Sequence, residues 1–209
     1  QYQTYDITAL LEAENDLRVT VANGWYSGYF GFGGERHNYG QENALLAMVV
    51  LTYEDGTETI LTTDETWHYT TGEVRSAEIY MGETIDRTFE SPESQPVQCV
   101  DHPKDVLVAQ ENDYVRITKR FKPVSKCITP NGEVVLDFGQ NMSGVVEVKV
   151  KAARGTVITL KHAEVLDKDG NFYTDNLRSA KATDTFICSG EAETFLPRFT
   201  FHGFRYVQV

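Results

Sequence analysis

The sequence has only three cysteines among its 209 residues, and their spacing restricts what they can do. Cys99, Cys127 and Cys188 form no C-x-x-C motif, and an odd, sparse set is not a disulfide framework. We therefore expect buried, reduced thiols. This usage favours the cytoplasm.

Long hydrophobic runs and an excess of basic charge are also missing. No run approaches the roughly 18 apolar residues of a membrane span, so no membrane partner is expected. The formal net charge is −12, and residues 1–100 carry 17 acidic against 4 basic residues. Because such a surface repels phosphate backbones, we expect no nucleic-acid partner. An acidic surface of this kind suits neutral ligands or cations.

The charge balance changes near residue 100, because residues 101–209 carry 14 acidic against 15 basic residues. Three prolines cluster between residues 91 and 104, where the hydrophobic pattern shows little periodicity. We interpret this stretch as a connector between two domains, residues 1–100 and 105–209. The chain opens on Gln1 within what reads as a strand, so we expect a piece of a longer chain, with a removed leader left open.

Short strands and tight turns make up most of what the chain does contain. Residues 145–151 alternate, with Val146, Val148 and Val150 on one face, which is typical of a half-buried strand. The polar residues 137–144 before them read as a turn or bulge, and Asp55-Gly56 as a hairpin tip. Further strands are expected at residues 17–21, 44–53, 58–62, 106–109, 114–121, 133–137, 156–162, 183–188 and 204–209. The predicted fold class is all-β, with two consecutive antiparallel, jelly-roll-like sandwiches and little helix.

Residues 24–40 are rich in glycine and aromatic side chains. The glycines do not fit G-x-G-x-x-G and no helix is expected to follow, so a dinucleotide site is excluded. Trp25 and Tyr26 are candidate carbohydrate-binding residues, because an aromatic face can stack on the C–H face of a sugar ring. The alternative is that both rings plug the core beneath the loop.

Two polar clusters in the second half resemble metal sites. His162 and Glu164 are two apart on an expected strand, as a metal pair or a structural polar pair would be. The structural pair is favoured, because no third ligand stands at a telling spacing. Residues 167–171 resemble the start of a calcium loop, but Gly170 is fourth instead of sixth, which favours a hairpin turn.

Glu83 and Asp86, with Arg87 beside them, could be the paired carboxylates of a glycosidase. A surface ion-pair cluster next to the connector is the favoured alternative. No Ser-His-Asp or Cys-His arrangement has a recognisable local motif such as G-x-S-x-G. The sequence therefore assigns no catalytic residue and no metal ligand.

A series of short segments, in order along nearly the whole chain, resembles the non-catalytic N-terminal part of bacterial α-L-rhamnosidases. The segments are Tyr5-Asp6-Ile7-Thr8, Gly24-Trp25-Tyr26-Ser27-Gly28, Thr63-Asp64 with Trp67, Tyr80-Met81-Gly82-Glu83, Asp137 to Gly144, His162-Ala163-Glu164, Asn176-Leu177-Arg178, and Phe199 to Tyr206. Any one of them is weak evidence, but the series is specific. The turn at residues 12–15 departs from the family's usual glycine before asparagine.

The resemblance implies an N-terminal rhamnosidase sandwich over residues 1–100 and a concanavalin-like sandwich over residues 105–209. It also implies a following α/α barrel that cleaves terminal α-L-rhamnose with inversion, using acidic residues beyond Val209. The chain would then be an accessory and scaffolding region, inert alone, with a rhamnose-containing glycoside and its own barrel as partners. No cofactor is required, and calcium is the ion that some members of the family bind. The alternative function is a free-standing carbohydrate-binding or adhesive β module.

Overall fold

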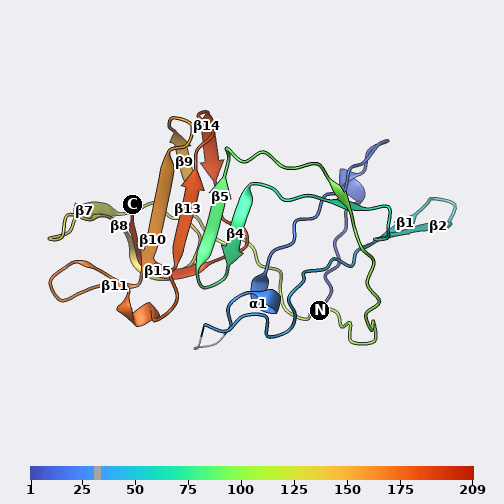
Figure 1. Ribbon diagram of the computed structural model, residues 1–209, viewed down its shortest axis with the longest axis horizontal. Helices are drawn as coiled ribbons and strands as arrows, with labels where there is room; N and C mark the ends of the chain where they lie inside the picture. Colours follow the sequence, from blue (N-terminus) through green and yellow to red (C-terminus); the bar gives the residue numbers. More distant parts are fainter. Residues whose placement is uncertain (31–33) are drawn as a thin grey trace.

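The computed structural model describes residues 1–30 and 34–209, and its regular structure is nearly all β (Figure 1). The centre of the predicted glycine-rich loop, residues 31–33, lies outside the described residues. Helix in the described part is limited to three short segments, η1 (Thr8–Leu10), α1 (Gly24–Ser27) and η2 (Asp175–Leu177). The predicted fold class, all-β with little helix, is confirmed.

A seven-stranded sheet dominates the C-terminal half of the chain. In spatial order its strands are β4 (Val74–Glu78), β5 (Gly82–Asp86), β13 (Thr183–Ile187), β10 (Val157–Ala163), β15 (His202–Gln208), β8 (Val134–Gly144) and β7 (Ser125–Ile128). Neighbouring strands pair antiparallel, except that β5 and β13 are parallel, with Thr84 opposite Thr185. The sheet thus joins segments that are 101 residues apart.

A second layer covers one face of this sheet and closes a hydrophobic core. It is the ribbon of β9 (Val148–Lys151) and β14 (Ala192–Phe195), which lies beside β13 and β10 in Figure 1. The Phe195 ring stacks on Phe186 of β13, with ring centroids 4.8 Å apart. The buried core consists of Ile85, Phe138, Leu160, Phe186, Cys188, Phe195, Phe204 and Val207. Alternate residues of the strands supply these side chains, as a half-buried sheet requires.

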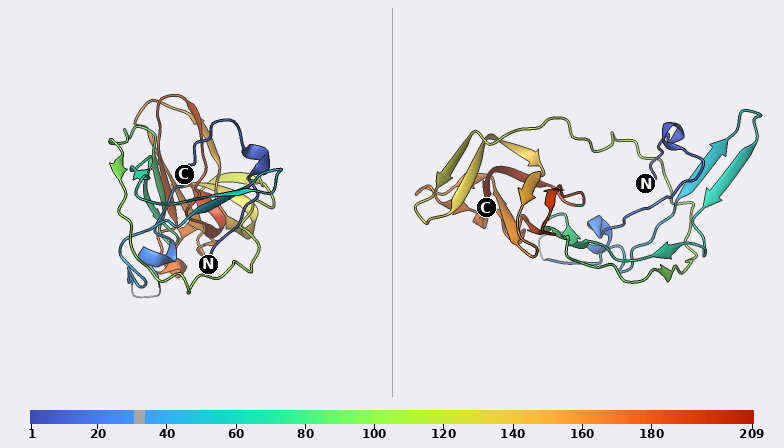
Figure 2. Two further views of the ribbon diagram at one scale, coloured as in Figure 1. Left: turned by 90° about the vertical axis from the view of Figure 1, so that its right-hand side faces the viewer. Right: turned by 90° about the horizontal axis from the view of Figure 1, so that it is seen from above.

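The first half forms smaller sheets and exposes much of its apolar surface. Strands β1 (Met48–Thr52) and β2 (Glu58–Thr62) make a hairpin whose tip is the predicted Asp55-Gly56, and it lies at the opposite end of an elongated molecule from the large sheet (Figure 2). The two-residue strands β3 (His68–Tyr69) and β6 (Gln95–Pro96) also pair, and in the second half β11 (Val165–Leu166) pairs with β12 (Phe172–Tyr173). The accessible surface of the chain is 15242 Å², whereas a compact chain of this mass exposes about 9,800 Å².

Three of the predicted strands are absent from the described structure. Residues 17–21, 106–109 and 114–121 adopt no strand, although two of them alternate in sequence. Val115 is fully exposed, so the alternating pattern there faces no partner. Alternation alone does not make a strand, because a strand is stabilised by pairing and by packing on a face.

The predicted turn at residues 137–144 is instead part of β8. Residues 134–144 form one strand that pairs with β15 at both ends, and the register shifts between Phe204 and Tyr206. The polar segment therefore contains the bulge that its composition indicates, but the strand continues through it. The apolar strand predicted to follow begins only at Val148.

Strands β4 and β5 were not predicted, and they bear on the organisation of the chain. Both precede the predicted connector at residues 91–104, yet they pair into the sheet of the C-terminal half. The division into residues 1–100 and 105–209 stays a prediction. The cysteine prediction is wrong in part: all three are free, as expected, but Cys99 and Cys127 are exposed and Cys188 alone is buried.

An ion pair fixes the bulge in β8. Arg205 of β15 donates from Nε and Nη2 to the two carboxylate oxygens of Asp137, both at 2.8 Å. Gly139 N also donates to Asp137 Oδ1. The hydrogen bond from Arg205 holds the pKa of the Asp137 carboxyl below its ordinary value of 3.8, although partial burial opposes this shift.

We expect this pair to make stability depend on pH at the acid end. Because the folded pKa of Asp137 is depressed, the pair stabilises the fold above about pH 3.8, and the contribution is lost as pH falls through the folded pKa. Arg205→Gln should lower the urea midpoint at pH 7 and reduce the loss of stability on acidification. Arg18→Gln is the control, because the Arg18–Asp16 pair is exposed at both side chains. If the two substitutions lowered the urea midpoint equally at pH 7, the stabilising role of the Arg205–Asp137 pair would be contradicted.

Candidate functional site

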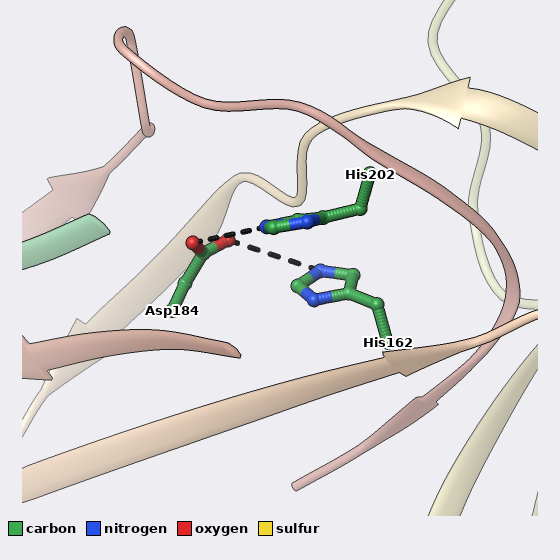
Figure 3. Close-up of side chains that lie close together, drawn as sticks. All are labelled: His162, Asp184 and His202. Carbon is green, nitrogen blue, oxygen red and sulfur yellow. Dashed lines mark hydrogen bonds and ion pairs between the residues drawn. The ribbon is translucent and has the colours of Figure 1, made fainter. Parts of the chain in front are cut away.

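Three adjacent strands of the large sheet bring two histidines and an aspartate together in the interior. His162 lies on β10, Asp184 on β13 and His202 at the start of β15 (Figure 3). Since β10 pairs with both other strands, side chains that face the core at these positions converge. One nitrogen or oxygen atom from each residue lies within 4.8 Å of those of the other two. We call these three residues the His-Asp-His cluster.

The two imidazoles stack on each other, and the carboxylate lies at their edges. The ring centroids of His162 and His202 are 4.1 Å apart with 27° between the planes. His202 Nε2 is 3.2 Å from Asp184 Oδ1, within hydrogen-bond distance, whereas His162 Nε2 is 3.8 Å from Asp184 Oδ2. His162 Nδ1 donates to the backbone carbonyl of Ala182 at 2.8 Å. Within residues 1–30 and 34–209, His162 Nε2 and Asp184 Oδ2 have no hydrogen-bond partner.

Burial sets the charge state of His162. His162 and Asp184 are fully buried, and His202 is 4 % exposed. Desolvation, with a smaller contribution from the neighbouring His202, lowers the pKa of His162 to about 4. His162 is therefore a neutral imidazole at neutral pH. Because solvent does not reach the cluster, it is not a site where a substrate can react.

Among the described residues, His162 and Glu164 have separate partners, so they form neither the metal pair nor the favoured structural pair. Glu164 follows β10 and accepts hydrogen bonds from the side-chain amides of Asn141 and Asn176, whereas the partners of His162 are those of the cluster. The missing partners, Asp184 and His202, stand 22 and 40 residues away on neighbouring strands. Spacing along the chain carries no signal for such a group, because sheet pairing assembles it.

Glu83 is a buried carboxylate and does not pair with Asp86. Its side chain is 1 % exposed, and Oε2 accepts the backbone N–H groups of Arg198 and Phe199 at 2.9 and 2.8 Å. Burial is the main cause of its raised pKa. Asp86 is three residues on, so it points to the other face of β5. Glu83 therefore belongs neither to a glycosidase carboxylate pair nor to a surface ion-pair cluster, and both predictions are wrong for this residue. Arg87 forms its ion pair with Glu73.

The proposed calcium loop is a turn. Asp167 Oδ1 accepts the backbone N–H groups of Asp169 and Asn171, and the strands on either side, β11 and β12, pair antiparallel. The hairpin interpretation is confirmed. The resemblance to a calcium loop arises because acidic and glycine residues also favour tight turns.

Trp25 and Tyr26 lie on the one-turn helix α1, partly exposed. Trp25 is 37 % exposed and packs edge-on against Phe30 and Tyr80, with centroids 5.4 and 5.0 Å apart. Tyr26 is 45 % exposed. The two rings are thus neither fully buried in the core nor fully exposed for stacking. Sugar binding and core packing both stay predictions for these residues.

A polar cleft of about 510 Å³ lies close to α1, between the first half and the large sheet. Its lining is Asn23, Tyr29, Arg36, Arg75, Ser76, Glu78, Met81, Gly82, Thr84, Lys181, Thr183 and Thr185. Glu78 organises one wall, because its carboxylate accepts from Tyr29 N, Asn23 and Arg36. Trp25 and Tyr26 do not line this cleft, so the structure does not join them to it.

Comparisons with known proteins match the two halves of the chain in turn. Residues 1–119 match the family described as the alpha-L-rhamnosidase N-terminal domain. Residues 128–209 match the bacterial alpha-L-rhamnosidase concanavalin-like domain. The two matches follow one another along the chain, as the resemblance in the sequence predicts.

Individual relatives agree with these matches. An alpha-L-rhamnosidase from Streptomyces avermitilis is 44 % identical over 223 residues, covering 100 % of this chain and 22 % of the relative. One from Alteromonas sp. is 37 % identical over 221 residues, covering 99 % of this chain and 24 % of the relative. The chain therefore spans about a quarter of the length of the curated relatives it matches.

Solved structures of alpha-L-rhamnosidases superpose on most of this chain. Native alpha-L-rhamnosidase from Aspergillus terreus superposes with a TM-score of 0.83 at 38 % identity, over 88 % of this chain and 23 % of that chain. The Streptomyces avermitilis enzyme complexed with L-rhamnose gives a TM-score of 0.81 at 42 % identity, over 90 % of this chain and 19 % of that chain.

Proposed function

Since the chain belongs to the α-L-rhamnosidase family, we propose that it is the non-catalytic N-terminal region of an enzyme that hydrolyses terminal α-L-rhamnose from glycosides. The observation that carries this proposal is the pair of consecutive matches, residues 1–119 and 128–209, within about a quarter of the relatives' length. The reacting groups would then lie in the remaining part of the full-length protein. This chain would support and position that part.

The acidic residues of this chain give no reason to place the reaction here. An inverting glycosidase holds two carboxyl groups roughly 6.5–9.5 Å apart across an open sugar pocket. Glu83 is buried and occupied by two backbone N–H groups, and Asp86 points away from it across β5. The buried carboxylate of Asp184 faces two imidazoles, with no room for a sugar ring.

The exposed apolar surface supports the scaffolding role. Large apolar side chains of the first half stand open to solvent, among them Met48 and Ile60 on the β1–β2 hairpin. Such exposure is typical of a surface that another part of the protein covers. We assign the remaining chain of the full-length enzyme to this surface, because about three quarters of the relatives' length lies outside the matched part.

Other partners are limited by charge and fold. The net charge of −12 disfavours nucleic acid. Among the described residues, no helix is both long and apolar enough to cross a membrane. Calcium, which the family resemblance allows, would bind away from the His-Asp-His cluster, because calcium takes six to eight oxygen ligands.

We expect the 209-residue chain to show no turnover of an aryl α-L-rhamnoside. The purified chain is assayed beside the Streptomyces avermitilis relative, which serves as the positive control. Full hydrolysis by the control and none by this chain is the expected result. Turnover that disappears in Glu83→Gln or Asp184→Asn would overturn the proposal, since it would place the reaction inside these sheets.

We propose Trp25 as a sugar contact of this region. Trp25→Ala should abolish binding of L-rhamnose, measured by calorimetric titration, because stacking needs the indole face. It should also cost about 2 kcal/mol of stability, since the ring makes two edge-on aromatic contacts. Tyr39→Ala, at a ring that is 66 % exposed, is the control and should change neither. If the parent chain binds no L-rhamnose, the proposal that Trp25 contacts a sugar is wrong.

A further inference from the structure

The His-Asp-His cluster contains two buried acceptor atoms that lie close to each other, His162 Nε2 and Asp184 Oδ2. His162 donates from Nδ1 to the Ala182 carbonyl, so its Nε2 carries a lone pair in the neutral ring. That nitrogen points at Asp184 Oδ2, which is also an acceptor, and neither atom has a partner. Unpartnered acceptors are expensive in a dry interior, so an electropositive group should lie between them.

The distances decide which group fits. A hydrogen bond between these atoms would need an N···O separation of about 2.7–3.2 Å, and the observed separation is 3.8 Å. A water bridging two acceptors with bonds of about 2.8 Å would hold them roughly 4.5 Å apart. A tetrahedral ion with bonds of about 2.0–2.1 Å holds its ligand atoms roughly 3.3 Å apart. The observed separations lie on either side of that value: 3.2 Å from His202 Nε2 to Asp184 Oδ1, and 3.8 Å from His162 Nε2 to Asp184 Oδ2.

We propose that the His-Asp-His cluster is a structural site for a divalent transition metal, with zinc as the best match. The ligands are His162 Nε2, His202 Nε2 and the Asp184 carboxylate. Two imidazoles and one carboxylate suit zinc and exclude calcium, which selects oxygen atoms. This inference does not depend on the proposed function.

The surroundings have the features of an outer coordination shell. A ligating histidine commonly donates its second ring N–H to a carbonyl, which fixes the tautomer and ring orientation. His162 Nδ1 does this with Ala182 O at 2.8 Å. Asp184 Oδ1 accepts the backbone N–H of Glu83 at 3.0 Å, which orients the carboxylate. The ion would connect β10, β13 and β15 through side chains, in addition to their backbone pairing.

The test measures metal content and thermal melting on the full chain, without a histidine tag. Zinc is added to protein that has been stripped with a chelator, and the bound metal is counted by elemental analysis. We expect about one zinc per chain. A free zinc concentration of about 100 times Kd should raise Tm by roughly 5–10 °C. Cobalt in place of zinc should give the visible absorption of a tetrahedral site.

Asp184→Asn is the decisive variant, because it keeps the size of the side chain. Its oxygen can still accept from Glu83 N, and its amide can donate to His162 Nε2, so the fold does not depend on the lost charge. We expect this variant to lose the zinc and the Tm shift. Glu164→Gln, which changes a carboxylate close in sequence to His162, should keep both.

Either of two outcomes would overturn the proposal. If the parent chain binds no zinc and its Tm does not change, the proposal is wrong and the cluster is a polar packing arrangement only. Zinc bound equally by the parent and by Asp184→Asn would place the metal elsewhere in the chain. Metal content and Tm can both be measured whether or not the enzyme has activity.

Discussion

Gly82→Ala is expected to destabilise the chain by more than about 4 kcal/mol, the largest effect we predict for a single substitution. Gly82 begins β5 with φ +110°, and its hydrogen faces the backbone of β13. A Cβ there would lie 2.6 Å from the carbonyl carbon of Thr183 and closer still to its oxygen. Because both clashing groups are backbone, neither can turn aside, and the parallel pairing of β5 with β13 must open.

Gly132→Ala separates this clash from ordinary backbone strain. Gly132 has φ +83°, and a Cβ at that position would meet nothing within 4 Å. Its substitution should therefore cost only about 1–2 kcal/mol, the penalty for an L-residue in the left-handed region. Urea unfolding of both variants gives the comparison. Equal losses would show that strain, and not the approach of β5 to β13, explains the need for glycine.

Phe186→Ala should cost roughly 3–5 kcal/mol, the second largest effect. The ring is fully buried in β13 and stacks on Phe195 of the covering ribbon, with 15° between the ring planes. Truncation leaves a cavity between the two layers, and the rigid sheets on both sides cannot close it. Chemical unfolding followed by tryptophan fluorescence and by circular dichroism should report the same shift.

Phe201→Ala is the matched control, because the same side chain is removed from a position that is 54 % exposed. Its cost should stay below about 1 kcal/mol. A loss as large as that of Phe186→Ala would mean that the buried cluster around Phe186 does not dominate stability. In that case the two-layer description of the C-terminal half would need revision.

Local chemistry made the turns and several strands predictable. Asp55-Gly56, Asn131-Gly132 and Asp169-Gly170 each close a hairpin in the structure, because glycine supplies the positive φ that these turns need. The alternating strands near residues 157–163 and 202–208 were also predictable, since one face of each is buried. The family resemblance, confirmed by the comparisons, came from short motifs spread along the chain.

Features that depend on distant partners could not be predicted. Strand β5 is polar and short, and it is a strand because it pairs with β4 on one side and with the distant β13 on the other. The buried environment of Glu83 has the same origin, since its partners Arg198 and Phe199 are more than 100 residues away. The His-Asp-His cluster likewise combines residues from three strands that only the folded sheet brings together. Conversely, residues 114–121 alternate but have no strand to pair with.

The parallel pairing of β5 with β13 also sets the order of events during synthesis. Thr84 leaves the ribosome 101 residues before its partner Thr185. At about 5–20 residues per second, that interval is roughly 5–20 s. The β4–β5 hairpin can form at once, because its strands are neighbours in sequence, but the edge that receives β13 stays open until then. An open edge can accept a strand from another nascent chain, so the risk of misassembly in this protein is concentrated in those seconds.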